Sequence, residues 1–127
     1  MRVLVCGARD YTDRARMYYV LDKLHKLHTF TLLIHGGAKG ADTLAGEWAR
    51  THNVPVKVFH ADWKKFGRAA GPIRNKQMLV KGQPDLVVAF PKTILAKSRG
   101  TKNMVMQAMK ALINVIVEEI HGETTPT

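Results

Sequence analysis

Short apolar runs alternate with amphipathic stretches along the whole chain. The runs lie at 3–6, 31–34, 54–59, 85–90 and 113–117. They are mostly continuous rather than alternating apolar and polar, which is typical of strands in a parallel sheet covered on both faces. Between them, apolar residues recur at three and four positions, the spacing of helices that bury one side. The pattern therefore predicts five strands separated by four helices.

The first helix is expected after an N-cap at Thr12 or Asp13, because either side chain can accept a hydrogen bond from the first helical turn. A second helix is expected at 41–50. The buried side of the first helix is expected to hold Met17, Val20, Leu21, Leu24 and Leu27.

Two further helices follow the third and fourth strands. Pro72 suits the first turn of a helix, and Gly82 suits its end. The last helix is expected at 101–112 and has the most regular spacing. Its buried stripe is expected to hold Met104, Val105, Ala108, Met109 and Leu112.

Strands and helices that alternate in this way predict an α/β fold. We expect a Rossmann-like, doubly wound parallel sheet of about five strands in a single domain. This domain is expected at 1–120, followed by a flexible tail at 121–127.

Composition and the N-terminal sequence indicate in which cellular compartment the protein is expected. No apolar run approaches the roughly 20 residues of a membrane-spanning helix. The N-terminus, MRVLVCGARD, is too short and too quickly polar for a signal peptide, so a cytoplasmic location is expected and no membrane partner. The single cysteine, Cys6, closes an apolar strand and is interpreted as a buried structural thiol.

Charge is concentrated in the middle of the chain. The formal net charge is +10, and residues 57–110 hold twelve Lys and Arg against two Asp. Such a segment favours an anionic partner such as a nucleotide, a phosphate or nucleic acid. The alternative explanation is that the positive charge only keeps the protein soluble.

Ligands of parallel α/β sheets bind beyond the carboxyl ends of the strands. The first strand is followed by "CGARD", in which Gly7 permits a tight turn and places Arg9 and Asp10 at the strand end. We therefore treat Gly7 and Arg9 as candidate ligand-binding residues and Asp10 as a tentative catalytic carboxylate.

The second strand is followed by a glycine-rich loop, "HGGAKGAD", that leads into a helix. Backbone N–H groups at such a junction bind anions, and glycines let a phosphate approach the backbone. The predicted phosphate-binding residues here are Gly36, Gly37, Lys39 and Gly40. Asp42 is interpreted as a helix cap, as a partner of a ribose hydroxyl, or as a second tentative catalytic residue.

The third strand is followed by "ADWKKFGRAAGPIRNKQM". Pro72 places Arg74 and Asn75 in the first helical turn, where Arg74 is aimed at the same sheet edge as the glycine loop. A guanidinium there suits a phosphate. Trp63 and Phe66 either stack on a base or pack under the loop, and we favour packing.

After the fourth strand, "PKTILAKSRG" forms either a mobile flap or an ordered loop. Gly100 and Thr101 then open the last helix, which predicts a second anion site, unless Thr101 is only an N-cap. Glycine or basic residues follow four strand ends, and together they predict a pocket for a phosphate-bearing ligand. The six histidines show no metal-ligand spacing, so neither a metal nor a cofactor is expected.

Taken together, "CGARDYTD", "HGGAKGADTLAGEWA", "ADWKKFGRAAGPIRNKQML", "PDLVVAF" and "GTKNMV" resemble the YspA-like, YpsA-related proteins of the SLOG superfamily. The resemblance spans 3–117 and keeps the motifs in order. It implies a Rossmann-like fold and a nucleotide-derived ligand, and superfamily members often pair, so a homodimer is expected.

Two relatives in this superfamily imply different functions. Lonely-Guy-type phosphoribohydrolases cleave the base–ribose bond of a nucleoside monophosphate. Their motifs match at Arg74, at Met78 and at Gly100–Thr101, whereas Asn75 replaces a lysine and Met104 falls on the catalytic glutamate position. DprA-type proteins carry an Arg-Asn pair after a strand and bind single-stranded DNA.

Three functions are therefore expected, in this order. The first is binding of a nucleotide or an ADP-ribose-like ligand. The second is nucleotide N-glycosidase activity, in which Asp42 or Asp10 would replace the lost glutamate and stabilise positive charge on the sugar. The third is binding of single-stranded nucleic acid by the basic segment, which lacks a clear row of stacking aromatic residues.

Overall fold

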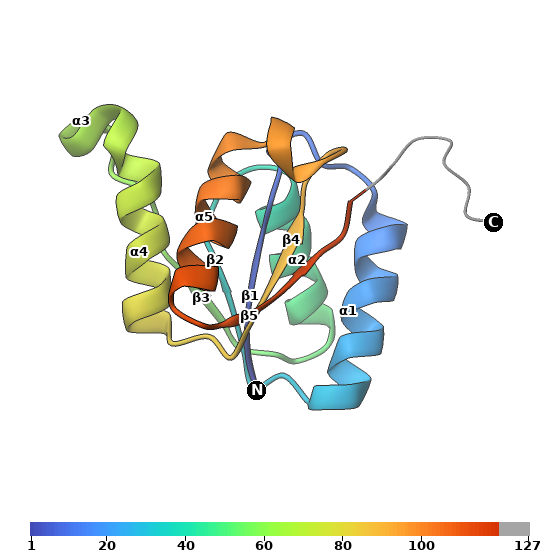
Figure 1. Cartoon of the computed structure of the whole chain (residues 1–127). Helices are drawn as coiled ribbons and strands as arrows, with labels where there is room; N and C mark the ends of the chain where they lie inside the picture. The colour runs from blue at the N-terminus through green and yellow to red at the C-terminus, as the bar shows by residue number, and fades with distance from the viewer. Residues whose placement is uncertain (120–127) are drawn as a thin grey trace.

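The computed structural model of the chain describes residues 1–119, and the predicted tail at 121–127 lies outside them. The elements follow one another from a first strand to a last strand (Figure 1). They are β1 (Arg2–Gly7), α1 (Arg14–His28), β2 (Leu32–His35), α2 (Ala41–Thr51), β3 (Val56–Val58), α3 (Trp63–Phe66), η1 (Gly67–Ala69), α4 (Ala70–Gly82), β4 (Leu86–Phe90), η2 (Leu95–Lys97), α5 (Arg99–Lys110) and β5 (Asn114–Val117).

Five strands form one sheet in the order β3-β2-β1-β4-β5, and all neighbouring strands are parallel. The chain moves outward from β1 to β3 and then crosses back to β4, which pairs with the other side of β1. This confirms the predicted Rossmann-like, doubly wound sheet. The direction of winding reverses between β1 and β4, and the carboxyl ends of two such strands are where ligands bind in this architecture.

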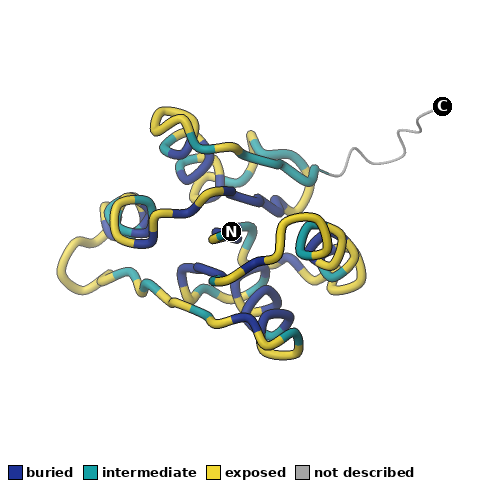
Figure 2. The backbone as a smooth tube through the Cα atoms, turned by 90° about the horizontal axis from the view of Figure 1, so that it is seen from below, coloured by how far each residue is buried: buried dark blue, intermediate teal, exposed yellow. Residues whose placement is uncertain are grey.

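The core lies in two layers, one on each face of the sheet. Alternate residues of β1 point to opposite faces, because side chains alternate along a strand. Val3 and Val5 pack with α1 and α2, whereas Leu4 and Cys6 pack with α4 and α5. Figure 2 shows the helices on both sides of the sheet, with their buried residues turned inward. Both faces are thus covered, which explains the continuous apolar runs.

Two of the predicted helical stripes extend too far. Leu27 in α1 is exposed, although Met17, Val20 and Leu21 are buried as predicted. In α5, Met104, Val105 and Ala108 are buried, but Met109 is 59% and Leu112 is 92% exposed. The prediction was wrong for Leu112 because α5 ends at Lys110.

Leu112 takes part in the turn that ends α5. Its N–H donates to the carbonyl of Met109, and the next N–H, from Ile113, donates to Ala108. These two bonds define the turn in which glycine usually holds the left-handed position. Leu112 has a φ of 61°, which a side chain disfavours.

Leu112→Gly is expected to raise the free energy of unfolding by about 1 kcal/mol, because glycine adopts this φ without the Cβ clash. Urea denaturation of the two proteins measures the difference. Leu27→Gly is the control: it removes another exposed leucine, from the last turn of α1, where glycine costs up to about 1 kcal/mol. A loss of stability in Leu112→Gly would contradict the strain argument.

Other boundaries differ from the prediction in small ways. Asp13 is the N-cap of α1 and accepts a hydrogen bond from the N–H of Arg16. The third strand spans only Val56–Val58, because Val54 packs into the core at the end of α2 and Pro55 only contributes its carbonyl to Leu33. The short helices α3 and η1 were not predicted, and α4 begins at Ala70.

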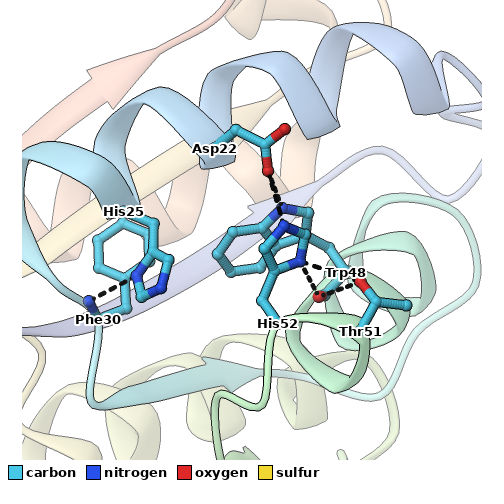
Figure 3. Close-up of polar contacts among 6 residues, drawn as sticks. All are labelled: Asp22, His25, Phe30, Trp48, Thr51 and His52. Atoms are coloured by element: carbon cyan, nitrogen blue, oxygen red, sulfur yellow. Dashed lines mark hydrogen bonds and ion pairs between the residues drawn. The ribbon is translucent and has the colours of Figure 1, made fainter.

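A polar and aromatic cluster joins α1 to α2 near their C-terminal ends (Figure 3). The indole N–H of Trp48 donates to Asp22, and the ring of His52 stacks on Trp48 with 4.4 Å between the ring centroids. The Nδ1 atom of His25 accepts a hydrogen bond from the N–H of Phe30. These contacts fix the two helices together at the end of the sheet where the strands begin.

Candidate functional site

A cleft of about 1040 Å³ opens at the carboxyl ends of β1 and β4. Its lining comes from five parts of the chain that lie far apart in the sequence. These are the turn after β1, Ala38 and Asp42 around the start of α2, Trp63 and Arg68 in α3 and η1, the first turns of α4, and the segment from Lys92 to Met104. In Figure 1, α4 and α5 run side by side and begin at the same end of the sheet. The cleft therefore occupies the place where this fold binds ligands.

The cleft brings together eight of the twelve residues predicted from the sequence: Gly7, Arg9, Asp10, Asp42, Arg74, Asn75, Gly100 and Thr101. The other four predicted residues do not line it: Gly36, Gly37, Lys39 and Gly40. The difference has a physical reason in the hydrogen bonds of the glycine-rich loop.

Three backbone N–H groups of the glycine-rich loop are already bonded within the protein. Those of Gly36 and Ala38 donate to one carboxylate oxygen of Asp42, Oδ2, at 2.9 and 3.2 Å. The N–H of Gly37 donates to Nδ1 of His35 at 3.0 Å. These three amides therefore bind Asp42 and His35 and are not open to an anion. Asp42 braces the loop and does not act as an N-cap of α2, whose cap is Gly40.

Glycine is required in this loop for close packing. Gly40 has a φ of 74°, and a Cβ there would lie 2.4 Å from the carbonyl oxygens of both Ala8 and Arg9. A Cβ on Gly36 would lie 2.5 Å from the guanidinium of Arg74. The glycines let the loop lie against the turn after β1 and against Arg74, which brings these two parts of the cleft together.

Arg74 is held from two sides. Its Nη1 donates to the carbonyl of Gly36 at 2.6 Å, and its Nε donates to Oδ1 of Asn75 at 3.1 Å. Within residues 1–119, Nη2 has no hydrogen-bond partner. Every fully buried side-chain nitrogen in that part of the chain has a partner, so Nη2 is not fully buried. Because Arg74 lines the cleft, Nη2 is accessible from it. Burial lowers the pKa of Arg74, an effect that nearby Asp42 opposes. The guanidinium still stays charged at neutral pH.

Asn75 links α4 to the start of α5. Its side chain is buried, and its Nδ2 donates to Oδ1 of Asn103 at 3.1 Å and, at 3.4 Å, to the carbonyl of Gly100. The amide therefore sets the position of the first turn of α5 relative to Arg74. This explains why an uncharged amide fits here.

The first turn of α5 forms one wall of the cleft. Ser98, Arg99, Gly100 and Thr101 all line it, and a Cβ on Gly100 would meet nothing within 4 Å. The hydroxyl of Ser98 donates to that of Thr101 at 2.9 Å. The first N–H groups of a helix have no partner within the helix and attract anions. An anion in the cleft can reach them.

Positive charge dominates the cleft. Beside the carboxylates of Asp10 and Asp42, it is lined by Arg9, Arg68, Arg74, Lys92, Lys97 and Arg99. Sequence reasoning did not single out Arg68, Lys92, Lys97 or Arg99. For Lys92, Lys97 and Arg99 the signal was present in the basic segment after the fourth strand, in which Leu95–Lys97 form the short helix η2. The hydrogen bond from the N–H of Leu95 to Glu119 holds this loop.

The two carboxylates of the cleft differ in environment. Asp10 pairs with Lys92 at 3.1 Å, and both side chains are largely exposed. Asp42 is buried, and burial raises its pKa to about 6 although the N–H of Ala38 and Arg74 oppose this rise. Its second oxygen, Oδ1, has no partner within residues 1–119 and, by the same reasoning as for Arg74, is accessible from the cleft. Asp42 can therefore gain or lose a proton near neutral pH.

His35 is buried beneath the glycine-rich loop. Burial lowers its pKa to about 4. It is neutral at pH 7, and because Nδ1 accepts from Gly37, its hydrogen resides on Nε2. His35 does not line the cleft.

Asp42→Asn is expected to steepen the loss of stability on acidification. The raised pKa of Asp42 favours the protonated folded state, so its contribution is lost as the pH rises from about 4 to about 6. The lowered pKa of His35 acts oppositely, and its contribution is lost as the pH falls from 6.5 to about 4. In the wild type, the contribution of Asp42 offsets that of His35 as the pH falls. Asp42→Asn leaves only the destabilising contribution of His35.

Urea midpoints at pH 4.5 and 7 measure this difference. The matched variant His35→Gln is expected to show the reverse, a gain on acidification relative to wild type. Parallel pH profiles for wild type and Asp42→Asn would contradict the assignment.

Cys6 forms part of the cleft floor as a buried thiol, and burial raises its pKa, which keeps it protonated. In the part of the chain that the structure describes, no group of three or more His, Cys, Asp or Glu could hold a metal ion. None of the helices found between residues 1 and 119 is long and apolar enough to cross a membrane.

Comparison with known proteins gives two matches. The sequence model of the YspA, cpYpsA-related SLOG family matches residues 1–66. Gene 61 protein of Mycobacterium phage D29 is 39% identical over 121 residues, which cover 91% of this chain and 94% of the phage protein. The family match includes the turn after β1, the glycine-rich loop and Asp42, while the phage protein extends the similarity to nearly the whole chain.

Proposed function

This chain belongs to the YspA, cpYpsA-related SLOG family, and on that premise we propose that its cleft binds a nucleotide or a nucleotide-derived ligand such as ADP-ribose. Membership suggests nucleotide-related binding or processing. The observation that carries the proposal is the convergence of six Arg and Lys residues and the N-terminal turn of α5 on one cleft between β1 and β4. The phosphate lies against that turn, and Nη2 of Arg74 donates to it.

Calorimetric titration with AMP, ADP-ribose, ribose 5-phosphate and adenosine tests the proposal. The three phosphate-bearing compounds are expected to bind. Adenosine is expected to bind at least about tenfold more weakly than AMP, since it offers no anion to the charge-assisted donors. Absence of binding by every phosphate-bearing compound, or equal affinity for adenosine, would contradict it.

A second candidate function, nucleotide N-glycosidase activity, is favoured by Asp42. A buried carboxylate with a pKa of about 6 and one oxygen accessible from the cleft can stabilise positive charge on a sugar. Met104, which lines the cleft at the position expected for a catalytic glutamate, cannot do so. Release of free base from a nucleotide panel, followed by chromatography, tests the activity. Full activity in both Asp42→Asn and Asp10→Asn would contradict these roles.

A further inference from the structure

An exposed tryptophan forms part of the cleft wall. Trp63 is the first residue of α3, lines the cleft and is 48% exposed, whereas the other tryptophan, Trp48, is fully buried. The sequence-based preference for packing under the loop is therefore wrong for Trp63. Trp63 therefore presents part of its ring to the cleft, where a bound ligand can contact it.

The ring of Trp63 is held in place by its surroundings. Asp62 caps α3 by accepting a hydrogen bond from the N–H of Lys65 at 3.1 Å. The edge of the ring lies at the start of α4, where a Cβ on Gly71 would be 3.4 Å from it. The Trp63 ring therefore lies beside the start of α4 at the cleft wall.

One face of the ring already carries a planar cation. The guanidinium carbon of Arg9 lies 5.3 Å from the centroid of the Trp63 ring. Arg9 comes from the turn after β1, so the contact spans the cleft from β1 to α3. A flat group of the size of a guanidinium or a nucleobase can lie on this face, since both stack on tryptophan.

We propose that Trp63 stacks on the base of the bound ligand and forms a subsite for a planar heterocycle. This inference rests on the proposed function. The base takes the place of the Arg9 guanidinium on the ring, and the displaced guanidinium is freed to join the other cations around the phosphate. At about 1040 Å³ the cleft is at the upper end of ligand pockets, so it can hold a base as well as a phosphate. Stacking tolerates any base, because each has a π face.

Affinities of AMP and ribose 5-phosphate for wild type, Trp63→Ala and Trp63→Phe test the subsite. A stacked base contributes about 1–3 kcal/mol, so AMP is expected to bind wild type about 5–150-fold more tightly than ribose 5-phosphate. In Trp63→Ala, AMP and ribose 5-phosphate are expected to bind with similar affinities, because the stacked base no longer contributes. Trp63→Phe keeps a ring and is expected to retain most of the preference.

Fluorescence gives a second readout that a merely structural role of Trp63 would not produce. AMP is expected to quench wild type, and the signal that Trp48 alone gives in Trp63→Phe is expected to stay constant. Ribose 5-phosphate affinity in Trp63→Ala is the internal control: it is retained or strengthened if the cleft is intact, because removal of the ring also frees the guanidinium of Arg9.

The outcomes separate this inference from the proposed function. If ribose 5-phosphate binds and Trp63→Ala leaves the affinity for AMP unchanged, the base subsite is overturned while phosphate binding stands. If neither compound binds wild type, both are overturned.

Discussion

Arg74→Lys is expected to weaken the binding of AMP by about 10–100-fold. Lysine keeps the charge but cannot hold the carbonyl of Gly36 and Asn75 while presenting a further N–H to the cleft, as the guanidinium does. A lost hydrogen bond to a charged group is worth about 1.5–3 kcal/mol, which corresponds to this factor. Calorimetric titration of the two proteins measures it.

Arg14→Lys is the matched control for Arg74→Lys. Arg14 forms an exposed ion pair with Glu47 at 2.8 Å and does not line the cleft. Its replacement is expected to leave the affinity for AMP unchanged. An affinity of Arg74→Lys within about twofold of wild type, with thermal stability preserved, would show that Arg74 does not bind the phosphate.

Gly40→Ala is expected to cost about 3 kcal/mol or more in free energy of unfolding. The added Cβ would lie 2.4 Å from two backbone carbonyl oxygens, neither of which can rotate away, and the φ of 74° is unfavourable for alanine. Overpacking of this kind typically costs about 1–3 kcal/mol, to which the backbone penalty of about 1–2 kcal/mol adds. Urea denaturation measures the loss.

Gly100→Ala provides the comparison for Gly40→Ala. A Cβ on Gly100 meets nothing within 4 Å, and the residue lies inside α5, where alanine is favoured over glycine by about 1 kcal/mol. Gly100→Ala is therefore expected to be as stable as wild type or more so. Equal losses in the two variants would indicate that the close approach at Gly40 is not what makes glycine necessary there.

The fold could be predicted because its determinants are local patterns. Continuous runs such as Leu86–Phe90 indicate a strand buried on both faces, and the structure buries every residue of this one. The end of α5 was predicted two residues too late because Leu112 continues the apolar spacing. Only the turn geometry, with its left-handed φ at Leu112, reveals that the helix has already stopped.

The site could be predicted only in part. Because Gly7, Arg74 and Gly100 follow strand ends in the sequence, we predicted that they lie close together, and all three line the cleft. The sequence shows that a loop is rich in glycine but not where its N–H groups point, and here those of Gly36, Gly37 and Ala38 point to Asp42 and His35. The exposure of Trp63 likewise depends on the short helix α3, which four residues are too few to predict.

The central claim is that phosphate binds at the N-terminal turn of α5, and amide chemical shifts test it most directly. Titration with ribose 5-phosphate, followed by ¹H–¹⁵N spectra, is expected to shift the backbone N–H signals of Gly100 and Thr101 in a saturable way. The indole N–H of Trp48, which donates to Asp22 at the opposite end of the sheet, is expected to stay in place. Saturable binding that leaves Gly100 and Thr101 unshifted would contradict the account.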